Sequence, residues 1–110
     1  MSNVEELLVY QLAHELTLYL YNITKKYPKE EIFGLTSQIR RAVASINTNL
    51  SEGSHRSSRA EYKHFVNIAR GSVGELKYLL LLSKDLEYLY NETYNTIILR
   101  VNAISKMLYG

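Results

Sequence analysis

Apolar residues recur at steps of three and four along four segments of this chain, and such spacing is typical of amphipathic helices. The predicted helices cover about residues 4–26, 36–53, 59–87 and 91–109. Pro28 ends the first of them, because proline cannot continue a helix interior. The connections are short, so successive helices should run antiparallel. We therefore predict an all-α fold, an antiparallel up-down-up-down four-helix bundle that forms one domain over residues 1–110.

Each predicted helix carries one apolar stripe that should face the core. In chain order the stripes are Val4, Leu8, Leu12, Leu16, Tyr19 and Ile23; Leu35, Ile39, Val43, Ile46 and Leu50; Phe65, Ala69, Ser72, Leu76, Leu79, Ser83 and Leu86; and Tyr94, Ile97, Ile98, Val101, Ile104 and Leu108. The third stripe alternates steps of four and three, as the seam of a coiled coil does.

Polar residues and one glycine predict where the helices begin and end. Ser58 and Glu61 have the spacing of a capping box, and Thr36 and Asn91 are suited to cap the second and fourth helices. Gly53 is placed to end the second helix in the left-handed conformation.

Two short runs are apolar around the whole helix. "YLLLL" (residues 78–82) and "LYLY" (residues 18–21) leave no polar face, because successive residues are about 100° apart. Exposed apolar patches of this kind mark interfaces. We predict a homo-oligomer whose interface includes Leu18, Tyr21, Leu81 and Leu82. The alternative is that these side chains lie scattered on the surface of a monomer.

Gly71 and Gly74 lie inside the third predicted helix, where each costs ~1 kcal/mol relative to alanine. Close approach of a neighbouring helix would offset that cost, and the second helix offers the small residues Ala42, Ala44 and Ser45. The alternative is a functional hinge at the glycines.

The composition excludes several classes of protein. The chain has no cysteine, which rules out disulfides and thiolate zinc sites. No apolar stretch approaches the ~20 residues of a membrane span, and Glu5 and Glu6 stand where a secretory signal would carry basic residues. We expect a soluble, cytoplasmic protein that does not contact membranes.

A polar stripe runs beside the apolar one on the second predicted helix. Its members are Gln38, Arg41, Ser45, Asn49 and Glu52. At the edge of a core they could form a structural hydrogen-bond network with Ser72 and Glu75 of the third helix. The alternative is a binding or catalytic groove in which Glu52 or Glu75 acts as a general base.

The sequence contains no complete catalytic or metal-binding pattern. Glu61 and His64 match one Glu-x-x-His motif of di-iron bundles, which need a second copy and two further glutamates. No nucleophile elbow and no glycine-rich phosphate loop occur. We therefore expect no enzyme activity, no metal and no cofactor.

Basic residues are concentrated in the middle of the chain. Residues 36–70 hold six basic and two acidic side chains, a local charge of +4 in a chain of net charge +2. Such a segment suits a polyanion, although a solvated helix surface explains it equally well. The predicted contacts to nucleic acid are His55, Arg56, Arg59 and Lys63, with Arg40 and Arg70 as secondary contacts.

Three segments together resemble a known family. They are "FGLTSQIRRAVASINTNLSEG" (residues 33–53), "IARGSVGEL" (68–76) and "LLLSKDLEYL" (80–89). With them the chain resembles the bacterial four-helix bundle proteins encoded in intervening sequences of 23S ribosomal RNA genes. A related family is the accessory variability determinant of diversity-generating retroelements, which partners a reverse transcriptase.

The resemblance implies a ring-shaped homopentamer with a basic surface, no known enzymatic activity and a suspected role in binding nucleic acid. The polar positions of the family motif correspond to Gln38, Arg41, Ser45, Asn49, Glu52, Ser72 and Glu75. The motif often has proline where this chain has Asn47. Our leading hypothesis is an assembly that binds RNA, DNA or a ribonucleoprotein partner, and the rival is a structural or protein-binding adaptor.

Overall fold

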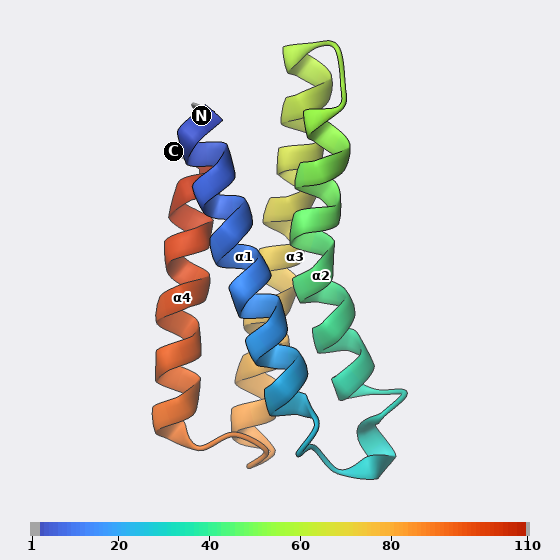
Figure 1. Ribbon diagram of the computed structural model, residues 1–110. Coiled ribbons are helices and arrows are strands. Elements are labelled where there is room, and N and C mark those ends of the chain that lie inside the picture. Colours follow the sequence, from blue (N-terminus) through green and yellow to red (C-terminus); the bar gives the residue numbers. More distant parts are fainter. Residues whose placement is uncertain (1–2, 110) are drawn as a thin grey trace.

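The computed structural model describes residues 3–109 and confirms an all-α four-helix bundle (Figure 1). The helices are α1 (Asn3–Thr24), α2 (Leu35–Ser54), α3 (Arg59–Asp85) and α4 (Asn91–Tyr109), with a short 3-10 helix, η1 (Lys29–Glu31), between α1 and α2. Each helix packs against its neighbours in the chain, and α4 also packs against α1. This arrangement places α1 and α3 at opposite corners of the bundle.

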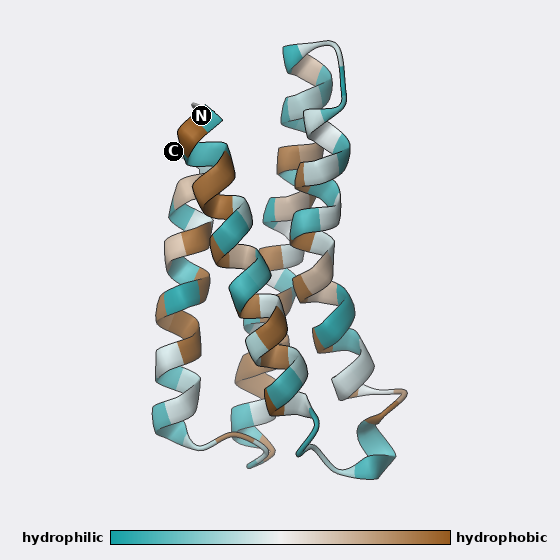
Figure 2. Cartoon of the chain, in the orientation of Figure 1, coloured by the Kyte–Doolittle hydropathy of each residue, from teal (hydrophilic) through white to brown (hydrophobic). Residues whose placement is uncertain are grey.

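The hairpin formed by α2 and α3 is longer than the rest of the bundle. Figure 1 shows these two helices continuing past the ends of α1 and α4, which finish beside one another. We call residues 54–63, at the free end of this hairpin, the tip. Figure 2 shows the tip in mostly teal and pale colours, so it is a polar projection from the bundle.

The predicted core stripes are largely confirmed in three helices and displaced in α1. The buried residues of α2 and α4 include Ile39, Val43, Ile97 and Val101, as expected. In α1, however, Val4 and Leu8 are exposed. The buried stripe of that helix is Val9, Ala13, Leu16, Leu20 and Thr24. Because α1 has apolar residues on several faces, its periodicity did not single out the side that packs.

Close packing of helices occurs at a different glycine from the predicted pair. A Cβ atom on Gly53 would lie 2.9 Å from Cβ of Phe65, so α2 and α3 approach closely there. Gly53 is helical and has a negative φ, so the predicted left-handed end of α2 is wrong. Gly71 and Gly74 are exposed, and a Cβ atom on either would meet nothing within 4 Å. The close contact predicted between these glycines and the second helix is therefore wrong within the chain.

The cap at Ser58 is confirmed, and the other two predicted caps are not. The Ser58 hydroxyl accepts a hydrogen bond from the Glu61 amide at 3.1 Å. Thr36 instead lies inside the first turn of α2, where the Glu31 carboxylate accepts from the Leu35 amide at 3.0 Å. Asn91 is already the first residue of α4. Within residues 3–109, no helix is long and apolar enough to cross a membrane.

Candidate nucleic-acid interface

The tip carries most of the basic residues that were predicted to contact nucleic acid. His55 is exposed in the turn after α2, where its Nδ1 lies 2.8 Å from the carbonyl oxygen of Ser51. Arg59 and Lys63 lie in the first two turns of α3, one helical turn apart, so their side chains share a face. With Arg56, the structure therefore brings four predicted contacts to one end of the hairpin.

Arg56 is held by its own hairpin. Its guanidinium group forms an ion pair with Glu52, one turn earlier in α2, and lies 4.9 Å from the centre of the Phe65 ring. The carboxylate neutralises much of the charge that Arg56 would offer to an anion.

Arg59 and Lys63, in contrast, are free. Both are exposed, and neither has a hydrogen-bond or ion-pair partner among residues 3–109. They also stand at the amino end of α3, where the helix dipole and the first amides favour negative charge. The unpaired positive charge of the tip is therefore concentrated on these two side chains.

Arg40 and Arg70 lie away from the tip and cap other helices. Arg40 donates from Nε to the Thr24 hydroxyl at 2.9 Å and from Nη2 to the Tyr21 carbonyl at 3.1 Å. These acceptors belong to the last turn of α1, which leaves its final carbonyls without helical partners. Arg70 caps the carboxyl end of α4 in the same way, because its Nε donates to the Leu108 carbonyl at 3.0 Å. Both guanidinium groups are thus engaged in the bundle.

Stacking on aromatic rings engages further cations. Arg40, Arg70, Lys84 and Arg100 lie 4.1 to 5.1 Å from the centres of tyrosine rings, in addition to Arg56 over Phe65. Proteins have about one such contact per 70–80 residues, so this chain is unusually rich in them. The local charge of +4 counted from the sequence therefore overstates the charge available to a ligand.

The predicted polar network is present in a smaller form. The Ser45 and Ser72 hydroxyls are 2.5 Å apart, and Asn49 donates to the Ser45 carbonyl at 2.8 Å. Gln38, Arg41 and Glu75 instead line an open groove of about 460 Å³ between α2 and α3. Glu52 points to Arg56 at the tip. Three of the seven predicted members are therefore bonded to one another.

The residues predicted for an oligomer interface differ in exposure. Leu18 is 59% exposed and Leu81 is 38% exposed. The Arg40 guanidinium group lies 4.8 Å from the centre of the Tyr21 ring, and Leu82 is partly buried against the core.

Sequence reasoning missed the most exposed aromatic side chain of the described residues, Phe33, at 96%. Ile32, beside it, is also exposed. An apolar pair directly before Gly34 and outside every helical stripe is the signal that could have found them.

Among residues 3–109, no three histidine, aspartate or glutamate side chains are grouped closely enough to hold a metal ion.

Comparison with known proteins agrees with this architecture. The family model for the 23S rRNA-intervening sequence protein matches residues 5–110. The fold is similar to a crystal structure of a protein of unknown function from the S23 ribosomal protein family of Bacteroides thetaiotaomicron. The TM-score is 0.87 and the sequence identity is 27%, over 96% of this chain and 95% of that chain. No curated protein was found to match the chain. The chain therefore belongs to the 23S rRNA-intervening sequence protein family.

Proposed function

We propose that this protein forms a ring-shaped homopentamer that binds RNA or DNA, alone or in a ribonucleoprotein with a partner such as a reverse transcriptase, and that it catalyses no reaction. The observation that carries the proposal is the pair of unpaired cations, Arg59 and Lys63, on a polar projection of the bundle. Exposed arginine and lysine side chains neutralise phosphates and release counterions. Arg56 and His55 would add weaker contacts beside them.

Assembly would multiply this small site. Rotational symmetry repeats the tip once per subunit, so several weak contacts can act on one strand at a high effective concentration. Such binding follows charge and spacing rather than base sequence, because phosphate contacts carry no sequence information. We therefore expect slight sequence preference and strong dependence on salt.

Two exposed faces of the bundle support assembly into a ring. On α1, Val4, Leu8 and Leu18 are exposed on one face. On α3, Tyr78 and Leu81 are exposed, and Gly71 and Gly74 extend the same face without side chains. Because α1 and α3 occupy opposite corners, contact between these faces would join two different surfaces. Such head-to-tail contacts close into rings when the rotation between subunits permits.

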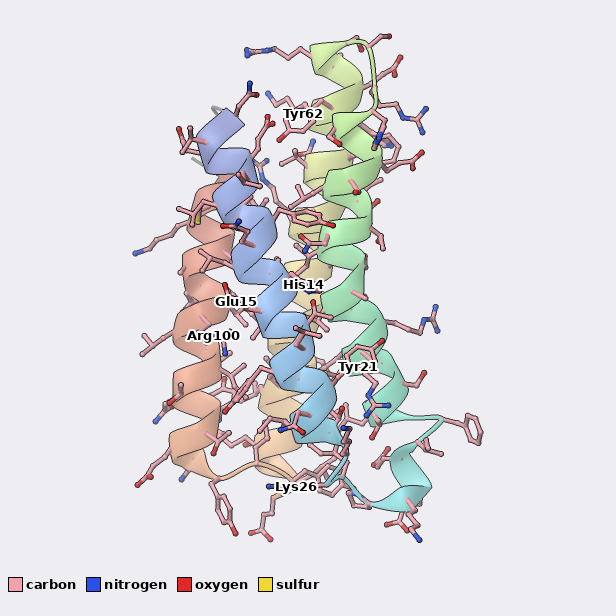
Figure 3. The ribbon with its side chains drawn as sticks, viewed as in Figure 1. His14, Glu15, Tyr21, Lys26, Tyr62 and Arg100 are labelled. Carbon is pink, nitrogen blue, oxygen red and sulfur yellow. The ribbon has the colours of Figure 1, made fainter. Side chains whose placement is uncertain are left out.

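The test of nucleic-acid binding is a titration of labelled single- and double-stranded RNA and DNA at two salt concentrations. The double variant Arg59→Glu, Lys63→Glu reverses the free charges of the tip. Its matched control, Lys25→Glu with Lys26→Glu, makes the same change of net charge at the opposite end of the bundle, where Figure 3 labels Lys26. Light scattering must show that both variants keep the wild-type assembly.

We expect the wild type to bind at low salt, with log K falling by roughly 0.7 to 0.9 per log unit of salt for each phosphate contact. The tip variant should lose most binding, and the control should keep it. Equal losses in the two variants would show that only net charge matters and would remove the tip from the site.

The rival function, a protein-binding adaptor, is favoured by one specific observation. Ile32 and Phe33 are exposed at the end of the bundle opposite the tip, and buried aromatic side chains are common anchors of protein interfaces. Failure of the wild type to bind any nucleic acid at low salt would support this rival. Phe33→Ser would then be the variant that separates the protein from its partner.

A further inference from the structure

A cavity of about 260 Å³ opens between the amino-terminal half of α1 and the hairpin of α2 and α3. Figure 3 shows Tyr62 at this place, between α1 and the free end of the hairpin. Leu7, Val9 and Leu50 form apolar walls, and Tyr10 and Tyr62 add two aromatic rings. Glu6 contributes the only carboxylate among the described lining residues. We call this space the notch.

The electrostatics of the notch favour a positive charge. None of the described residues that line it is lysine, arginine or histidine. Burial, a hydrogen bond to Glu6 and the negative charge of that carboxylate together raise the pKa of Tyr62 to about 12. Burial, the largest of these causes, disfavours any charge, whereas the negative charge of Glu6 favours a cation placed beside it.

The shape and the neutral polar groups of the notch restrict the ligand further. Pockets for whole cofactors and drug-sized molecules measure about 300–1,000 Å³, so the notch suits a group the size of one side chain. Ser54 donates its hydroxyl proton to the Ser51 carbonyl at 2.8 Å, which leaves the hydroxyl oxygen able to accept. Apolar walls suit an alkyl stem, and aromatic faces attract cations.

We propose that the notch binds an alkylammonium or alkylguanidinium group, with the Glu6 carboxylate as its counter-ion and the rings of Tyr10 and Tyr62 as its walls. Two sources carry this chemistry: a lysine or arginine side chain of a polypeptide, and a free polyamine. The proposal does not depend on nucleic-acid binding at the tip, because it uses none of the free cations there.

Calorimetric titration of the full chain tests the proposal. The probes are butylammonium and butylguanidinium, with butanol as a neutral control of similar length. We expect both cations to bind and butanol to bind at least about tenfold more weakly, because only the cations interact with the carboxylate.

Variants identify the site. Glu6→Gln keeps the shape of the side chain and removes its charge, and should weaken cation binding about tenfold. Glu15→Gln is the matched control, because Glu15 is exposed on the same helix and does not line the notch. Tyr62→Phe keeps the ring and should retain binding, whereas Tyr62→Leu removes the aromatic wall and should weaken binding severalfold. Circular dichroism checks that each variant keeps its helices.

Two further probes separate the sources. A lysine residue blocked at both ends represents a polypeptide side chain, and spermidine represents a free polyamine. The tighter of the two identifies the source, and either result supports the notch as a cation site. Equal binding of butanol and butylammonium, unchanged affinity in Glu6→Gln, or no binding of any cation at millimolar concentration would each overturn the proposal.

Discussion

The guanidinium group of Arg70 donates two hydrogen bonds to the backbone carbonyl oxygen of Leu108, at 3.0 Å from Nε and 2.7 Å from Nη2. The same group lies 4.1 Å from the centre of the Tyr109 ring. A side chain of α3 therefore satisfies the carboxyl end of α4, which its own backbone cannot do. Arg40 has the same relationship to the carboxyl end of α1.

We expect Arg70→Met to destabilise the fold by ~1 to 2 kcal/mol, because hydrogen bonds from charged groups are worth more than neutral ones and this one is only half-buried. Urea unfolding measures the change in the free energy of unfolding. Lys77→Met is the control. It also removes a cation from α3, but the Lys77 side chain makes no hydrogen bond or ion pair among residues 3–109. Equal effects of the two substitutions would contradict the capping role.

The glycines of α2 and α3 should respond to alanine in opposite directions. At Gly53 the new methyl group would meet Phe65 at 2.9 Å, and overpacking of this kind costs ~1 to 3 kcal/mol. At Gly74 the added methyl group meets nothing within 4 Å in its own chain, so better helix propensity should stabilise a dissociated subunit by ~0.5 to 1 kcal/mol. Thermal unfolding of the two variants compares them directly. Stabilisation by Gly53→Ala would show that the hairpin relaxes freely at that point.

The mass in solution should be a multiple of the 12.7 kDa chain, and a pentamer is the expected state. Leu18→Glu places a charge on the exposed apolar face of α1 and should shift the protein towards smaller species. Tyr90→Glu, in the connection between α3 and α4, is the control. Size exclusion coupled to light scattering provides the measurement, and a wild type that runs as a single chain at micromolar concentration would refute assembly.

Alkaline pH should weaken the fold through Tyr88. Its hydroxyl donates to the Glu31 carboxylate at 2.9 Å. This hydrogen bond, burial and the charges of Glu31 and Glu30 raise the pKa of Tyr88 above its ordinary value of 10.0. The folded state therefore holds the phenol proton more tightly than the unfolded chain does. The resulting stability is complete below the ordinary pKa and is lost as pH rises through the raised one.

Urea midpoints measured from neutral pH to beyond pH ~10 check this expectation. Tyr88→Phe should lower stability at neutral pH and reduce the loss on going alkaline. Tyr90→Phe, an exposed neighbour, should leave the pH profile unchanged. A profile that is identical in wild type and Tyr88→Phe would exclude Tyr88 as the linked group.

Local chemistry made parts of this fold predictable. Ser58 and Glu61 are only three residues apart in the chain, so their cap could be predicted from spacing alone. The stripes of α2 and α4 followed from a single apolar face. The stripe of α1 could not be fixed in this way, because the exposed Val4 and Leu8 are as apolar as the buried Val9 and Leu20. Only the neighbouring helices decide which set is buried.

The basic surface was less predictable for a related reason. The number of basic side chains can be counted from a sequence, but the groups to which Arg40 and Arg70 donate hydrogen bonds belong to other helices. Arg70 finds the Leu108 carbonyl 38 residues away, and Arg40 finds that of Tyr21 19 residues away. The same holds for Gly53, whose close neighbour Phe65 belongs to the next helix. The sequence grouped His55, Arg56, Arg59 and Lys63 at one end of the hairpin, where the structure also has them, but the prediction included Arg40 and Arg70, which the bundle itself uses.

The projection of the α2 and α3 hairpin beyond α1 and α4 has a consequence for how such a protein can diversify. Residues 55–61 are all exposed, so substitutions there remove little from the shared core. The side chains of the tip can therefore change with small effects on folding, much as those of a loop on a rigid scaffold can. A relative that keeps Leu76 and Val101 in its core could carry an acidic or aromatic tip on the same frame and serve a different partner.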